Sequence, residues 1–140
     1  MGVDLGSRRI GIAVSDSAGT MASPRTTVVR SGDPQRDRQA LADLAVEEEV
    51  AVVVVGHPRG MDGSRGAAAR AAEDEAEALA GLLADRGIAV ELFDERLTTV
   101  TAQRSLAAGG TRGRGQRAVV DRAAATVLLD AWLDARRGGA

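Results

Sequence analysis

The apolar run at residues 50–55 (VAVVVV) constrains the fold of this chain more than any other stretch. Six residues are too few for a buried helix, and valine favours extended backbone. An apolar run without alternation is typical of a strand buried on both faces, as in a parallel sheet with helices on both sides. We therefore expect an α/β domain in which this run forms a buried strand.

The first sixteen residues predict a β-hairpin. Two apolar runs, at residues 1–5 and 10–14, flank a short Gly-Ser-Arg-Arg stretch. Residues 24–30 (PRTTVVR) predict a third strand, which completes an antiparallel meander. Only three residues precede Asp4, whereas a central strand usually has about five or six. This short start is compatible with a chain that begins upstream of Met1 or has been shortened.

Helical patterns and two more strands alternate along the rest of the chain. Their start and stop signals are Asp33-Pro34 at a helix start and Gly87 at a helix end. The expected elements are a helix from Pro34 to about Glu49, a helix over about 65–86, a strand over 88–93, a helix from Thr98 or Thr99 to Ala108, and a helix over about 117–135. We expect one domain over residues 1–140, with a five-stranded mixed sheet of three antiparallel and two parallel strands flanked by helices.

Composition excludes several classes of protein. The chain has no cysteine, which excludes disulfides, thiolate chemistry and zinc sites built on cysteine. No apolar stretch is long enough to span a bilayer and no signal peptide is recognisable, so we expect a cytoplasmic protein without membrane contact. The net charge is −2, so contact with nucleic acid would depend on a local basic patch.

Asp4 lies inside the first apolar run, where a buried strand normally carries an apolar residue. An ionised carboxylate in such a place costs several kcal/mol unless it is neutralised. Gly6, two residues later, allows a ligand or another backbone to approach closely. An aspartate bonded to the backbone of a turn is the alternative, and we take Asp4 as the first candidate for a metal or phosphate site.

Other carboxylates follow later elements. In open α/β sheets, ligands bind at the carboxyl ends of the strands. Asp94 and Glu95 follow the last strand and point to opposite faces, so at most one joins Asp4, and solvated loop charges are the alternative. Asp121 borders the apolar stripe of the last helix, where an acid that favours the helix dipole is the alternative. Asp130 lies about half a turn away in angle and is expected to be solvated.

Carboxylates on three separate elements are what a pair of Mg²⁺ or Mn²⁺ ions requires. These ions prefer hard oxygen ligands, and in two-metal sites they lie roughly 4 Å apart. Such a pair activates a water and stabilises the leaving oxygen in phosphodiester cleavage.

Four stretches of the sequence resemble the YqgF/RuvX family of bacterial RNase H-like nucleases, a group linked with Holliday junction resolution and with pre-16S rRNA processing. They occur in the family's order and cover essentially the whole chain: 2–16 (GVDLGSRRIGIAVSD), 55–64 (VGHPRGMDGS), 94–99 (DERLTT) and 120–129 (VDRAAATVLL). The second stretch departs from the family pattern at His57, where an apolar residue is more frequent, and at Gly60, where asparagine is more frequent.

The resemblance implies an RNase H-like fold and a metal-dependent nuclease site at Asp4, Glu95 and Asp121. It is the resemblance that selects Glu95 over Asp94. Many related resolvases carry a fourth acid one helical turn beyond the last one, where this chain has Ala124 and Ala125. We therefore expect the second metal to be weakly held.

Arginines near the expected site are candidates for phosphate contacts, with plain solvation as the alternative. They lie in the first hairpin and around a glycine-rich basic loop at 109–116: Arg8, Arg9, Arg112, Arg114 and Arg117. The single histidine, His57, could position a water or the substrate, although the family's usual apolar residue there indicates that it is dispensable. Aromatic residues are scarce, which argues against base stacking, and Trp132 is expected in the core.

The expected function is a metal-dependent endonuclease that acts on structured nucleic acid. The resemblance offers two substrates, the 5′ end of pre-16S rRNA and four-way DNA junctions. The RNA is slightly favoured, because a junction resolvase must cut as a dimer and no dimer face is evident; we expect a monomer or a weak homodimer. The main alternative is a non-catalytic module that binds RNA or the ribosome. An actin-type or sugar-kinase ATPase is set aside, because those proteins need two such domains.

Overall fold

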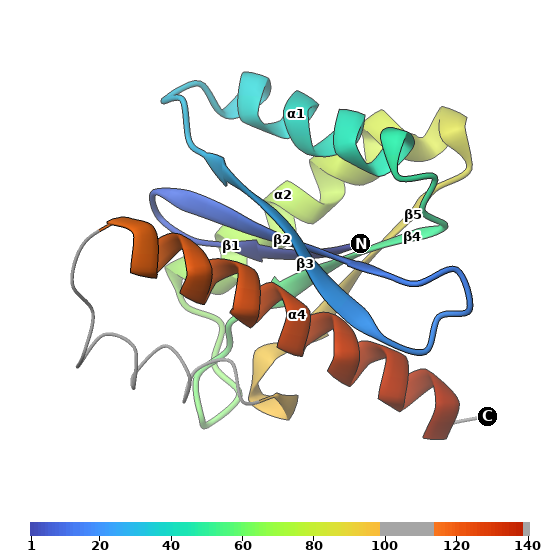
Figure 1. Cartoon of the computed structure of the whole chain (residues 1–140). Helices are drawn as coiled ribbons and strands as arrows, with labels where there is room; N and C mark the ends of the chain where they lie inside the picture. Colours follow the sequence, from blue (N-terminus) through green and yellow to red (C-terminus); the bar gives the residue numbers. More distant parts are fainter. Residues whose placement is uncertain (99–113, 139–140) are drawn as a thin grey trace.

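The computed structural model describes residues 1–98 and 114–138, and for residues 114–121 it describes the backbone only (Figure 1). The elements, in chain order, are β1 (Gly2–Leu5), β2 (Arg9–Ser15), β3 (Ala22–Val29), α1 (Pro34–Glu47), β4 (Val52–His57), α2 (Ala67–Leu83), η1 (Ala84–Arg86), β5 (Ala89–Asp94), η2 (Glu95–Leu97) and α4 (Arg114–Gly138). The predicted helix from Thr98 or Thr99 to Ala108 falls almost wholly outside the described residues.

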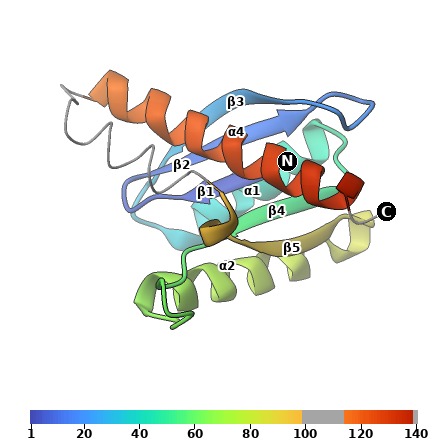
Figure 2. The same cartoon turned by 90° about the horizontal axis from the view of Figure 1, so that it is seen from below.

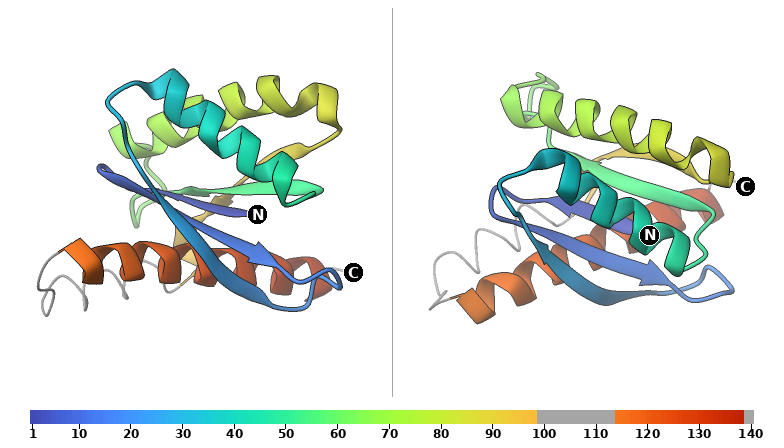
Figure 3. Two further views of the ribbon diagram at one scale, coloured as in Figure 1. Left: turned by 45° about the horizontal axis from the view of Figure 1, so that its top comes forward. Right: turned by 90° about the horizontal axis from the view of Figure 1, so that it is seen from above.

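The strands form one sheet in the order β3-β2-β1-β4-β5. β2 pairs antiparallel with β1 and β3, whereas β4 pairs parallel with β1 and β5. This confirms the expected mixed sheet of a three-strand meander and two parallel strands. Because only β2 runs the opposite way, β1, β3, β4 and β5 all end at the same edge of the sheet. Helices α1 and α2 cover one face and α4 covers the other (Figures 1, 2 and 3).

Val53, Val54 and Val55 of β4 are buried and face both sides of the sheet, as the continuous apolar run predicts, although the strand begins at Val52 and not at Val50. Val53 and Val55 belong to the core under α1 and α2, together with Leu41 and Leu79. Val54 belongs to the core under α4. β4 is therefore a central strand with a helical layer on each side.

Gly2 lets α4 approach β1 closely. A Cβ atom at Gly2 would lie 2.9 Å from the carbonyl oxygen of Ala125 and 3.0 Å from Cβ of Leu129. Val3 belongs to the core on the opposite face. Since side chains alternate along a strand, position 4 lies on the same face as Gly2, the face that α4 covers.

Local signals at element ends are confirmed. The Asp33 side chain caps α1 by accepting a hydrogen bond from the Gln35 amide (3.0 Å), and Pro34 occupies the first helical position. Gly87 has a φ of 69° and ends the helical segment that began at Ala67. This left-handed conformation is one that glycine adopts without steric cost.

Several boundaries differ from those predicted. The predicted loop after residue 55 begins two residues later, because Gly56 and His57 continue the parallel pairing with β5. β3 begins at Ala22 instead of 24 and contains a proline, which an edge strand tolerates. α4 begins at Arg114, so Arg114 lies on a helix and not in the basic loop. A glycine at position 115 costs roughly 1 kcal/mol of helix stability, but it does not exclude helical backbone.

Two predictions for α4 need correction. Asp130 is not a solvated charge, because its Oδ1 accepts a hydrogen bond from the Ala22 amide (2.9 Å) and ties α4 to β3. Trp132 is only partly buried: its ring packs against the core, its Nε1 lies 3.4 Å from Oε1 of Glu91, and the Arg136 guanidinium lies 4.6 Å from the ring centroid. An indole with a polar edge is well suited to such a boundary position. None of the helices described here combines the length and the apolarity needed to cross a membrane.

Candidate active site

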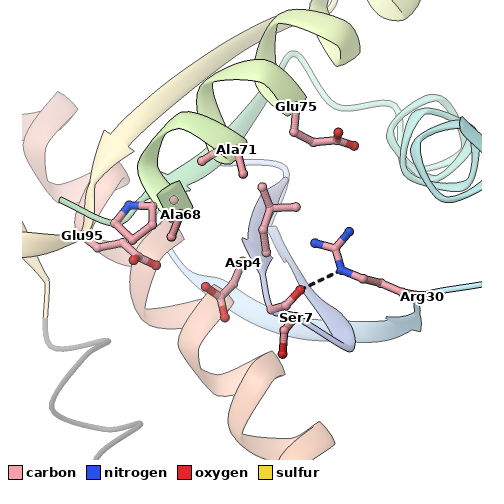
Figure 4. Close-up of a pocket in the computed structure, with 12 residues that line it drawn as sticks. Asp4, Ser7, Arg30, Ala68, Ala71, Glu75 and Glu95 are labelled. Atoms are coloured by element: carbon pink, nitrogen blue, oxygen red, sulfur yellow. Dashed lines mark hydrogen bonds between the residues drawn. The ribbon is translucent and has the colours of Figure 1, made fainter. Parts of the chain in front are cut away.

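A cavity of about 310 Å³ lies at the edge where the like-directed strands end (Figure 4). Its lining comes from the end of β1 and the turn after it, from the end of β4, from the first residue of η2 and from the side of α2. Arg30, directly after β3, completes the lining. Segments far apart in the sequence thus meet at one place, as expected for the ligand site of an α/β sheet.

Asp4 and Glu95 both line this cavity, and both are buried. Asp4 is 1% exposed and Glu95 is 5% exposed. Their carboxylates come from β1 and η2 and point into the same part of the cavity (Figure 4). Gly11 lies opposite Asp4 on β2, so no side chain from the neighbouring strand competes with the Asp4 carboxylate for space.

Gly56 makes room for the Glu95 side chain. A Cβ atom at Gly56 would lie 2.8 Å from Oε1 of Glu95 and 3.3 Å from its carboxyl carbon. Such a separation is shorter than any ordinary contact between a methyl group and oxygen. The glycine at the end of β4 therefore determines where the Glu95 carboxylate can lie.

Of the adjacent acids, Glu95 enters the cavity and Asp94 does not line it. Asp94 caps η2 by accepting a hydrogen bond from the Arg96 amide (2.9 Å). It also forms an ion pair with the Arg96 guanidinium (Oδ2 to Nη2, 2.6 Å), and these hydrogen bonds hold the pKa of Asp94 below its usual range. Arg96 thus binds the Asp94 carboxylate outside the cavity.

Asp121 lies on α4, and its side chain is outside the described part of the structure. Ala124 and Ala125, which stand where related resolvases carry a further acid, are both buried in apolar clusters. Within the described residues, no three histidine or acidic side chains form a group that could hold a metal ion. The described part of the candidate site therefore consists of Asp4 and Glu95.

The hairpin arginines do not line the cavity. Arg8 is exposed in the turn between β1 and β2, and Arg9 is half-buried at the start of β2. Arg112 is outside the described residues, and Arg114 and Arg117 lie on the first turns of α4.

Arg30 also lines the cavity, and it lies outside the four family motifs. Arg30 is the last residue of the predicted third strand, and no local pattern marked it as a site residue.

His57 ends β4 and pairs with a glutamate of α2. Its Nε2 lies 2.7 Å from Oε2 of Glu73, which also accepts a hydrogen bond from Nε of Arg65 (2.7 Å). The Arg65 and His57 side chains together lower the pKa of Glu73 to about 2. His57 thus ties the end of β4 to α2 beside the cavity and is not part of its lining.

The donor set suits a hard divalent cation. Asp4 and Glu95 offer carboxylate oxygens, which are the ligands that Mg²⁺ and Mn²⁺ prefer. Because both carboxylates line one cavity, both could contribute oxygens to a single divalent cation.

Comparison with known proteins identifies the family. The family model for RuvX, described as a Holliday junction resolvase, matches residues 1–135. A protein of Mycobacterium sp. (strain KMS) named "Putative pre-16S rRNA nuclease" is 48% identical over 137 residues, which cover 98% of this chain and 80% of that protein. The protein of the same name from Mycobacterium leprae (strain Br4923) is 50% identical over 134 residues, which cover 96% of this chain and 71% of that protein.

Among solved structures, the chain resembles Thermus thermophilus RuvC with a TM-score of 0.55 and 14% identity, covering 98% of this chain and 95% of that one. Thermus thermophilus RuvC in complex with a Holliday junction substrate gives a TM-score of 0.57 at 15% identity, and the match covers 98% of this chain and 94% of that one. At this identity the likeness concerns the fold, and it supports the RNase H-like architecture. The chain therefore belongs to the RuvX family, and with it to the hydrolases that act as nucleases.

Proposed function

We propose that this chain is an endonuclease that cleaves phosphodiester bonds in structured nucleic acid with the help of Mg²⁺ or Mn²⁺. The observation that carries the proposal is that two buried carboxylates from separate elements, Asp4 and Glu95, share one cavity. Structural roles alone rarely bring two buried acids to the ligand-binding edge of a sheet.

Asp121 is proposed as the third ligand. Position 121 precedes Ala124 and Ala125 by three and four residues, and both alanines are buried. Positions with these spacings share one side of a helix. Since Ala125 packs against Gly2, position 121 falls one helical turn from the contact between α4 and β1. This spacing along the helix supports Asp121 as the third ligand.

In the proposed reaction, Asp4, Glu95 and Asp121 would hold the cation. A bound divalent ion supplies an activated water and stabilises charge on the leaving oxygen. The chain's own contribution is to fix the oxygen ligands on rigid elements. Asp4 is held in the sheet by its pairing with β2, and Glu95 is held by the short turn of η2. The cavity beside them leaves space for the substrate strand.

The proposed substrate is the 5′ region of pre-16S rRNA, four-way junction DNA, or both. The names of the curated relatives support the RNA, and the family description supports the junction. Symmetric cleavage of a junction requires two active sites, and thus a dimer on the substrate. Cleavage of the RNA by a protein that sedimentation shows to be monomeric under the same conditions would favour the RNA as the substrate.

The proposal is tested by a cleavage assay with pre-16S leader RNA, duplex RNA, single-stranded RNA and four-way junction DNA, with and without divalent metal. Asp4→Asn and Glu95→Gln should each reduce cleavage by about a hundredfold or more, because even residues that only support metal ligands contribute 10–100-fold. In EDTA both variants should be at least as stable as the wild type, since each removes repulsion between the two acids.

The matched control is Asp94→Asn, which neutralises the neighbouring acid outside the cavity and should retain most of the activity. Cleavage by Asp4→Asn at the wild-type rate would refute the assignment of the site. Tight binding of RNA with no cleavage under any metal condition would favour a non-catalytic module that binds RNA or the ribosome. The burial of Ala124 and Ala125, in place of a fourth acid, is the observation that favours this second candidate.

A further inference from the structure

Arg30 lines the same cavity as Asp4 and Glu95 (Figure 4). It is distant from both in the sequence and directly follows β3. Its Nε donates a hydrogen bond to the carbonyl oxygen of Gly6 (2.7 Å), in the turn that follows β1. Its backbone amide donates to the carbonyl oxygen of Arg8 (2.9 Å), which extends the pairing of β2 and β3 by one residue. These two bonds tie Arg30 to the turn that follows the strand of Asp4.

The hydrogen bond from Nε to Gly6 leaves the two terminal nitrogens of the Arg30 guanidinium available. Within the described residues, Arg30 forms no ion pair, and its only side-chain hydrogen bond uses Nε. An arginine held by Nε presents Nη1 and Nη2, and this fork suits the two oxygens of a phosphate.

Neighbouring acids form their hydrogen bonds and ion pairs with partners other than Arg30. The Asp37 carboxylate accepts the Ser31 amide at both oxygens (3.0 and 3.2 Å); hydrogen bonding to Ser31 is the main cause of its lowered pKa, and the charge of Arg30 contributes without a hydrogen bond or ion pair. Glu75, on the α2 wall of the cavity, is paired through Oε2 with Arg38 (2.9 Å). Arg30 is thus the cation that the described lining offers to an anionic ligand.

Small residues leave much of the cavity open. Ala68 and Ala71 of α2 are exposed where they line the cavity, and Gly56 and Gly6 add no side-chain bulk. A volume of about 310 Å³ is at the lower end of the range for ligand sites, roughly 300–1,000 Å³. Such a space accommodates one nucleotide unit of a strand and not a duplex.

We propose that Arg30 is a substrate-positioning residue that binds a phosphate next to the scissile one, and that the cavity holds the nucleotide between them. This inference rests on the proposed nuclease function of the Asp4–Glu95 site. In this arrangement the guanidinium fork fixes one phosphate of the strand while the two acids lie beside the next. The effect is on orientation: the strand can present only one of its linkages to the carboxylates.

The first test measures binding of fluorescent four-way junction DNA and of single-stranded RNA in EDTA at several salt concentrations. Arg30→Gln keeps a side-chain amide that can donate to Gly6 but loses the charge, and Arg30→Lys keeps the charge. For Arg30→Gln we expect about tenfold weaker binding, and the slope of the logarithm of the binding constant against the logarithm of salt concentration should be reduced by about one. For Arg30→Lys this slope should be close to that of the wild type. Arg25→Gln is the control, because Arg25 lies on β3, the strand that Arg30 follows, and is paired with Glu48.

The second test uses junction strands with one neutral methylphosphonate linkage beside the cleaved bond. The wild type should lose about tenfold in kcat/KM at one such position, and Arg30→Gln should lose nothing further there, because the contact is already absent. A merely structural role would give an equal additional loss in both proteins. Thermal unfolding of each variant separates loss of folding from loss of binding.

The outcomes distinguish this inference from the proposed function. Binding by Arg30→Gln equal to that of the wild type and of Arg25→Gln overturns the role of Arg30, while cleavage dependent on Asp4 still stands. An Arg30-dependent salt slope without any cleavage supports the phosphate contact and contradicts the nuclease proposal. Competition by a free mononucleotide 5′-phosphate as strong as that by a strand would show that the site serves a small ligand, and would overturn the inference.

Discussion

Gly56 and Glu95 are packed so closely that a single methyl group on Gly56 would overlap with the Glu95 carboxylate, at 2.8 Å from Oε1. Gly56→Ala should therefore displace Glu95 from the cavity, because the alternative is a shift of β4 within its parallel pairing. We expect a loss of about 1–3 kcal/mol in stability from overpacking, together with a loss of cleavage larger than this destabilisation explains. Cleavage rates and urea unfolding of the same preparations measure both effects.

Gly66→Ala is the control for this substitution. Gly66 precedes α2, and a Cβ atom there would meet nothing within 4 Å. It should leave cleavage unchanged. If Gly56→Ala were as active as Gly66→Ala, the position of Glu95 would not matter for the reaction.

The metal requirement follows from the number of acids. With Ala124 and Ala125 buried in the core, the chain offers no carboxylate at the place of a fourth ligand. One of two metals would then be held weakly, so activity should need millimolar metal, and Mn²⁺ should support it better than Mg²⁺ because it tolerates looser geometry. Titrating each metal in the cleavage assay tests this, and saturation at micromolar Mg²⁺ would contradict it.

Stability at low pH should depend on Glu73. Its pKa is lowered from an ordinary 4.5 to about 2, chiefly by the hydrogen bond from Arg65 and then by that from His57. A carboxyl with a lowered folded-state pKa stabilises the protein fully above its unfolded value, and this contribution disappears as the pH falls from about 4.5 to about 2. Glu73→Gln should therefore be less stable than the wild type at pH 6, and the difference should shrink across this window.

Urea unfolding of both proteins between pH 6 and about pH 3 measures the difference. Asp74→Asn is the matched control, since Asp74 is the next residue of α2 and is exposed. A constant difference between Glu73→Gln and the wild type down to the lowest pH would show that the ionised carboxylate is not what stabilises this region.

Arg112, outside the described residues, and Arg114 and Arg117, on the first turns of α4, remain predicted phosphate contacts. Replacing Arg112, Arg114 and Arg117 together by glutamine should weaken binding similarly for all sequences and reduce the log–log salt slope by roughly two to three. Folding should change little if these charges are solvated. Fluorescence anisotropy at several salt concentrations measures the slope, and unchanged binding would remove these arginines from the nucleic-acid site.

Arg136 and Arg137, near the end of α4, serve as the binding control. Both have partners in the fold: Arg137 donates to the carbonyl oxygen of Thr20 (3.0 Å), and Arg136 lies over the ring of Trp132. Replacing both should therefore lower stability somewhat while leaving binding unchanged. If replacing Arg136 and Arg137 weakened binding as much as replacing the other three arginines, the effect would come from the overall charge of the protein and not from specific phosphate contacts.

Local interactions explain what the sequence by itself determined. The run of valines predicted a strand buried on both faces, because valine favours extended backbone and every residue of the run is apolar. Asp33-Pro34 and Gly87 marked element ends, because capping and left-handed backbone depend on adjacent residues only. Family resemblance then named Asp4, Glu95 and Asp121 from short motifs.

Contacts between distant segments decided the rest. Asp94 and Glu95 are adjacent and chemically alike, and only the turn of η2, the Arg96 partner and the gap above Gly56 place one of them in the cavity. Arg30 reaches the cavity because β3 ends beside the turn after β1, which no local pattern reveals. Asp130 is bonded and not solvated because α4 packs across β3. Charged side chains take their partners from whatever the fold brings near, so their roles follow from tertiary structure, whereas apolar periodicity is already present in the chain.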